Sequence, residues 1–173
     1  MKTALLVLML VLNALILQAQ SPTAVNQVKA VFLFNFTQFV TWPSFSFNGN
    51  HAPFVIGVLG TDPFGQYLDN VVEGEQVDGH PIIVKRYDEA KEAKECHILF
   101  INKSNPAEAL KEVNTQGILT VSDADNFARK GGMIRFSVEN NRIRLQINAR
   151  AAKEASLSIS SKLLRLANVI NAP

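Results

Sequence analysis

The chain has 173 residues and one cysteine, with 47% hydrophobic residues, 18% charged residues and a formal net charge of +2. This length suits one domain with its own core. The balanced charge, without a basic tail or a single-sign block, argues against nucleic acid as a partner, and a lone Cys96 excludes an internal disulfide.

The first residues have the layout of a secretory signal peptide. A basic start at Lys2 precedes an apolar run over residues 4–17, and the small residue Ala19 offers a cleavage site. The run is shorter than the roughly 20 residues of a spanning helix, which favours cleavage over an uncleaved anchor. We therefore expect a signal peptide over residues 1–19, export to the periplasm, and one mature domain over residues 20–173 that meets the membrane only through a partner.

The mature chain opens with a helical pattern over residues 21–41, closed by Pro43. Apolar runs typical of strands then alternate with helix starts. Strands are expected over residues 54–59, 81–86, 96–101 and 117–121, and helices from Pro63, from Asp88, from Asn105 and over residues 122–130. Alternating units of this kind predict an α/β fold, with a mostly parallel sheet flanked by helices on both faces.

The next segment has a different pattern, in which apolar and polar residues alternate along two short runs. If Asn140 and Asn141 form a two-residue turn, Val138 faces Ile143 and all apolar residues share one side of an antiparallel hairpin. The other side carries three arginines that could hold an anion or an acidic partner, although such a stripe is more often only solvated; they are Arg135, Arg142 and Arg144. Helices are expected over residues 149–156 and again to about residue 170.

Motifs for catalysis, metal binding and nucleotide binding are missing from the sequence. It has neither a phosphate-binding glycine loop nor a G-x-S-x-G elbow. The histidines His51, His80 and His97 have no second ligand at metal spacing. We therefore expect no enzymatic activity, no metal and no cofactor.

Polar side chains follow three of the predicted parallel strands. If those strands are neighbours, the loops after them converge on one edge of the sheet and could bind a small molecule or a protein loop. Most of these residues also suit helix capping without any ligand. The binding candidates are Thr61, Asp62, Phe64, Asn102, Ser104, Ser122 and Asp123.

Several stretches, taken in order, resemble the YfiR-like periplasmic proteins. The resemblance is carried by residues 29–36 with Phe39 and Trp42-Pro43, and by residues 57–60, 62–65, 96–101, 119–123, 127, 131–134, 148, 151–152 and 157–164. It implies an exported α/β protein that restrains a membrane-bound diguanylate cyclase through its periplasmic domain, without catalysis and with homodimers. It also implies a disulfide between a cysteine like Cys96 and a partner near Gly57, which this chain cannot form.

Three hypotheses for function follow. The first is a regulatory binding protein acting on a membrane-bound sensor, either a diguanylate cyclase or a histidine kinase. The second is a periplasmic small-molecule-binding module, and the third, a hydrolase, lacks a legible nucleophile–base pair. For a partner interface the candidates are apolar residues of the first and last helices, namely Phe34, Phe39, Leu163 and Leu166.

Overall fold

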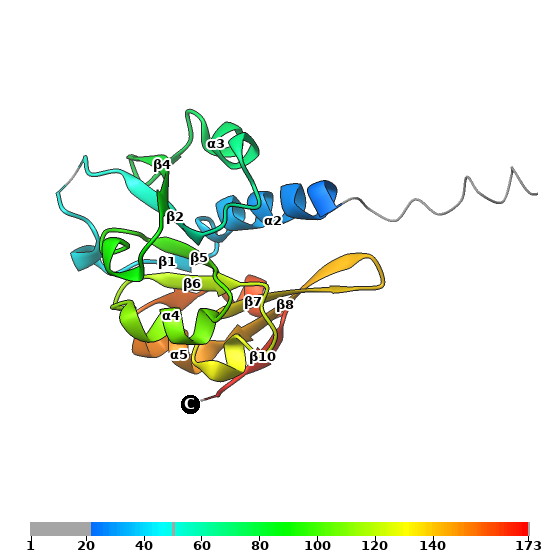
Figure 1. The fold of residues 1–173 in the computed structure, drawn as a ribbon. Coiled ribbons are helices and arrows are strands. Elements are labelled where there is room, and N and C mark those ends of the chain that lie inside the picture. The colour runs from blue at the N-terminus through cyan, green and yellow to red at the C-terminus, as the bar shows by residue number, and fades with distance from the viewer. Residues whose placement is uncertain (1–21, 50, 173) are drawn as a thin grey trace, which may run out of the picture.

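The computed structural model describes residues 22–49 and 51–172 as a mixed α/β domain (Figure 1). The signal peptide expected over residues 1–19 lies outside these residues. One sheet has the strand order β10-β8-β7-β6-β5-β2-β4-β3. Its strands are β2 (Phe54–Gly60), β3 (Gln76–Val77), β4 (His80–Tyr87), β5 (Ile98–Asn102), β6 (Leu119–Ser122), β7 (Ile134–Glu139), β8 (Arg142–Asn148) and β10 (Asn168–Ile170).

The middle of the sheet is parallel, from β4 through β2, β5 and β6 to β7. Its central strands β2, β5 and β6 are the apolar runs that the sequence predicted, and almost every residue in them is buried. A strand without a polar face needs cover on both sides, which is the arrangement of a parallel sheet between helices. The antiparallel pairs are β7 with β8 and β3 with β4.

Helices pack on both faces of the sheet. They are α2 (Pro22–Phe36), α3 (Gln66–Val72), α4 (Pro106–Glu112), α5 (Ala149–Glu154) and α6 (Ser161–Leu164). The larger core cluster joins Leu33 of α2 and Leu68 of α3 to Phe100. The smaller cluster joins Leu110 of α4 to Leu99, whose side chain points to the other face because neighbouring residues in a strand alternate.

The hairpin has the predicted register. Val138 pairs with Ile143, and the positive φ angles of Asn140 and Asn141, 49° and 61°, form the tight turn between them. Phe136 reaches inward to stack on Phe36 of α2, with ring centroids 6.0 Å apart. The hairpin tip projects from the body of the domain in Figure 1.

Three predicted helices are wrong. Residues 88–95 contain only the 3-10 turn η2 (Ala90–Glu92), and residues 122–130 contain only η3 (Ala128–Lys130). In the second case the Ser122 hydroxyl accepts the amide of Ala124 at 3.2 Å, and Asn126 has a φ of 60°, which ends any helix. The predicted closing helix is instead the short β9 (Ser158–Ile159), the four-residue α6 and the strand β10.

Two helix boundaries also differ from the prediction. α2 ends at Phe36 because residues 37–39 form a turn and the next two enter β1 (Val40–Thr41), which pairs with β9. A further 3-10 turn, η1 (Ser44–Ser46), follows. α3 begins at Gln66 rather than Pro63, because Asp62 Oδ1 accepts the amide of Phe64 at 2.7 Å and holds the chain in a turn first.

Candidate functional site

The loops after β2 and β5 meet at one edge of the sheet, as the topology predicted. The amide of Thr61 donates to the carbonyl of Asn102 at 3.2 Å, and Asn102 Nδ2 donates to the carbonyl of Thr61 at 2.7 Å. Next to them the buried Ser122 hydroxyl donates to the carbonyl of Ile101 at 2.7 Å. These polar groups bond to one another, so they hold the loops together.

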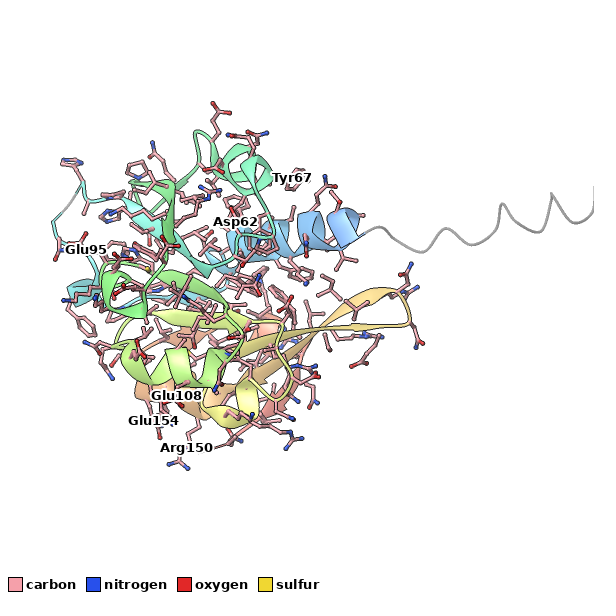
Figure 2. All side chains as sticks on the ribbon, viewed as in Figure 1. Asp62, Tyr67, Glu95, Glu108, Arg150 and Glu154 are labelled. Atoms are coloured by element: carbon pink, nitrogen blue, oxygen red, sulfur yellow. The ribbon has the colours of Figure 1, made fainter. Side chains whose placement is uncertain are left out.

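Asp62 and Phe64 are also engaged within the domain. Asp62 Oδ2 accepts from Arg86 Nε at 2.8 Å, and Arg86 reaches both carboxylate oxygens of Asp69 on α3, at 3.0 and 2.6 Å. The hydrogen bonds from Arg86 lower the pKa of Asp69. Phe64 is buried edge-on against Phe100, with centroids 4.8 Å apart. Figure 2 shows Asp62 in the region between α3 and α2.

The two remaining edge residues, Asp123 and Ser104, differ from each other. Asp123 pairs with the buried Lys29 of α2 at 2.7 Å, and Ser104 lines a cavity of about 200 Å³ with Asn105 and Asp125. The seven candidates therefore lie along one edge, and most of their polar groups already have partners. Ligand binding at this edge stays a prediction.

The four interface candidates differ in exposure. Leu163 is 3% exposed and belongs to the core, because α6 packs it inward. Phe34 and Phe39 are half-buried against the same cluster. Leu166 is 74% exposed, beyond the end of α6. The structure thus removes Leu163 from the accessible surface and leaves Leu166 as the most exposed of the four.

The polar face of the hairpin forms a pocket of about 370 Å³ with the segment that leads into β10. Its cations are Arg135 of β7, Arg144 of β8 and Arg165, and its one carboxylate is Glu139. We call it the arginine pocket. The sequence predicted Arg135 and Arg144 on one face but missed Arg165, because that residue was assigned to the interior of a helix that in fact ends at Leu164.

The arginines of the pocket differ in their partners. Arg135 is half-buried, donates from Nε to the carbonyl of Ala124 at 3.1 Å, and pairs with Asp125. Arg144 and Arg165 are exposed and make no side-chain hydrogen bond or ion pair within residues 22–49 and 51–172. Arg142 shares their face of the hairpin but does not line the pocket. Two unpaired guanidinium groups can bind carboxylate or phosphate oxygens.

A second pocket, of about 320 Å³, lies at the amino end of β5 and is lined by Lys85, Cys96 and His97 among others. His97 Nδ1 accepts the amide of Val55 at 3.0 Å, and its buried Nε2 makes no hydrogen bond of standard geometry within residues 22–49 and 51–172, although the backbone of Ser46 interacts with the ring. Burial lowers the pKa of His97 to about 4 and raises that of Cys96 to about 11. Both groups are therefore uncharged at neutral pH.

Neither metal ligation nor membrane insertion is indicated by the described residues. They contain no group of three His, Cys, Asp or Glu side chains that could hold a metal ion. None of the helices in this part of the chain is long and apolar enough to cross a bilayer.

The structure is a mixed α/β domain with a projecting hairpin (Figure 1). The exposed Arg144 lies on this hairpin, and the exposed Arg165 and Leu166 lie on the segment beside it. The family model described as YfiR/HmsC-like matches residues 26–168, and the chain belongs to this family. The match confirms the family resemblance seen in the sequence motifs. A search of curated proteins found no match.

Proposed function

We propose that this protein is a periplasmic regulator that restrains a membrane-bound diguanylate cyclase by binding its periplasmic domain, and so limits cyclic di-GMP and biofilm growth. The observation that carries the proposal is the match to the YfiR/HmsC-like family over residues 26–168, because the resemblance to YfiR-like proteins implies a regulator without catalysis of its own. A stretch with the layout of a signal peptide, residues 1–19, supports export.

Restraint of this kind needs only differential binding. If the protein binds the inactive conformation of the sensor more tightly than the active one, complex formation shifts the population toward the inactive state. The equilibrium between inactive and active conformations is a property of the sensor. This domain therefore only has to bind one of them and needs no catalytic group. A buried α/β core with a projecting hairpin (Figure 1) suits such a role.

The test is a pull-down of the exported, tagged chain from detergent-solubilised membranes of its own host, with mass spectrometry of the captured proteins. We expect a membrane protein with a periplasmic domain and a cyclase domain, and higher cyclic di-GMP when the regulator is deleted. Capture of a histidine kinase would keep the regulatory role and change the pathway. Capture of nothing by folded protein, together with unchanged cyclic di-GMP on deletion, would contradict the proposal.

A second candidate function, a small-molecule-binding module, is favoured by the pocket at His97. Small-molecule sites are concave and combine apolar lining with a few polar groups, and this pocket joins Val55 and Ile118 to Lys85 and His97. Thermal-shift screening with a panel of small carboxylic acids and aromatic metabolites tests it. A ligand of this pocket should raise the melting temperature of the wild type more than that of His97→Gln, and the absence of any shift would count against this function.

A further inference from the structure

One edge of β8 is free beside the arginine pocket. β10 pairs with β8 from Gln146 to Asn148, no strand in the described part of the chain pairs with residues 142–145, and the segment over residues 165–167 lines the arginine pocket together with Leu145. Glu139 and Arg142 flank the two-residue turn and form a hydrogen-bonded pair, so the next pair, Val138 with Ile143, is of the non-hydrogen-bonded kind. The amide and carbonyl of Ile143 therefore point away from β7, toward the free edge.

The two faces beside this edge have different chemistry. One face carries Arg142 and Arg144 and continues into the arginine pocket, where Arg165 lies. The opposite face carries the half-buried Ile143 and Val138, which is 50% exposed. Because side chains alternate along a strand, a segment laid beside residues 142–144 would send every second side chain to the arginines and the others to the apolar face.

Charge decides between the candidate occupants of this edge. A second copy of this chain, paired through the same edge by two-fold symmetry, would bring Arg142 and Arg144 against the same residues of its partner. Like charges at that distance oppose the pairing. An acidic segment would instead supply carboxylates to Arg144 and Arg165, which have no ion pair within residues 22–49 and 51–172.

We propose that an extended segment of a partner protein, with acidic and apolar residues in alternation, docks as an added strand on β8 and places a carboxylate in the arginine pocket. The proposal rests on the proposed function for the identity of the partner. The sensor would then contact this chain along the unpaired edge of β8 and through the arginine pocket.

The first test uses the exported, purified chain and a blocked, fluorescently labelled peptide of alternating glutamate and valine. We expect binding that raises the fluorescence anisotropy and slows amide hydrogen exchange at Ile143. The variant R144E/R165E should weaken binding by about tenfold or more, since close charge pairs are reversed to repulsion. The control R129E/K153E has the same net charge and alters two exposed cations outside the pocket, so its binding should match the wild type.

Two altered peptides separate strand addition from general charge attraction. Lysine in place of glutamate should abolish binding, and methylation of the amides that would face β8 should do the same while leaving the charge unchanged. Equal binding of the methylated peptide, equal binding by R144E/R165E, or no binding up to about 1 mM peptide would overturn the proposal. So would a stable dimer of the free chain in which the Ile143 amide is already protected, because a second copy would then occupy the edge.

The pull-down with R144E/R165E distinguishes this inference from the proposed function. If the wild type captures a membrane sensor and R144E/R165E captures it equally well, the docking surface is wrong and the regulatory function stands. If the wild type captures no sensor, the proposed function fails, while the peptide measurements still decide whether the edge of β8 takes an acidic strand.

Discussion

Lys29 of α2 and Asp123, which follows β6, lie 2.7 Å apart although 94 positions separate them in the chain. The Lys29 side chain is 8% exposed and the Asp123 side chain 38%. A second, longer contact joins Lys29 Nζ to Asn26 Oδ1 at 3.4 Å. The pair fixes the first described helix to the carboxyl edge of the sheet.

Asp123→Ala should lower the free energy of unfolding by roughly 1–3 kcal/mol, because it leaves a buried ammonium group without its carboxylate. Urea denaturation measures the change. The control is Arg150→Ala, whose pair with Glu154 is exposed at the surface (Figure 2) and should contribute within roughly 0.5 kcal/mol. Equal losses in the two variants would mean that Lys29 reaches solvent when Asp123 is removed.

Gly57→Cys should form a disulfide with Cys96 in an oxidising compartment. A Cβ added to Gly57 would lie 2.7 Å from Cys96 Sγ and 2.9 Å from the ring of Tyr87, so a covalent bond relieves the first of these clashes. Thiol counting in denaturant should find no free thiol in Gly57→Cys. The control Gly57→Ser keeps the clash, retains one thiol and should lose roughly 1–3 kcal/mol of stability. Two free thiols in Gly57→Cys would contradict the expected geometry.

The buried imidazole of His97 predicts an acid-sensitive fold. Burial lowers its pKa from 6.5 to about 4, so the unfolded chain takes up a proton at a higher pH than the folded one. Stability that is present above about pH 6.5 should therefore be lost as the pH falls through about 4, by roughly 3 kcal/mol. Urea unfolding across this range measures the slope. His97→Gln keeps an amide near Val55 but does not titrate, so its slope should be flatter, and an unchanged slope would assign the acid sensitivity to other groups.

Alanine substitutions at Leu163 and Leu166 should separate a loss of folding stability from a loss of sensor binding. Leu163→Ala leaves a cavity in the core and should cost roughly 2–4 kcal/mol, measured by urea denaturation. Leu166→Ala removes a side chain that is 74% exposed and should change stability by less than about 0.5 kcal/mol. Because Leu166 lines the arginine pocket, the same variant should weaken capture of the sensor. Full capture by Leu166→Ala would remove this residue from the interface.

The sequence predicted those parts of the fold in which the pattern of apolar residues is compatible with only one secondary structure. The run in β2 is buried on both faces, and the alternation in β7 and β8 brings all apolar side chains to one face only in the observed register. The segment over residues 157–170 is compatible both with a helix and with short strands. Its apolar residues Ile159, Leu163, Leu166 and Ile170 recur at helical spacing, but Asn168–Ile170 pairs with β8 as a strand, and tertiary pairing overrides so short a local preference.

The candidate site was less predictable because its members come from distant parts of the chain. Arg135 and Arg144 face the same way because they share a hairpin, which the sequence pattern indicates. Arg165 joins them only through the path of the chain between α6 and β10, and no local signal marks it. For Asp123 the position was predictable but the partner was not. The sequence predicted Asp123 at the correct edge of the sheet, whereas its buried partner Lys29 lies on a helix whose prediction rested only on apolar residues.

The short ribbon of β1 and β9 joins Val40 to Ile159, about 120 positions apart. Contacts of such long range close late, because the loop entropy must be lost before the contact forms, and they slow folding. The β1–β9 ribbon should therefore form after the local strand–helix units that lie between its two strands, so that it closes the domain last.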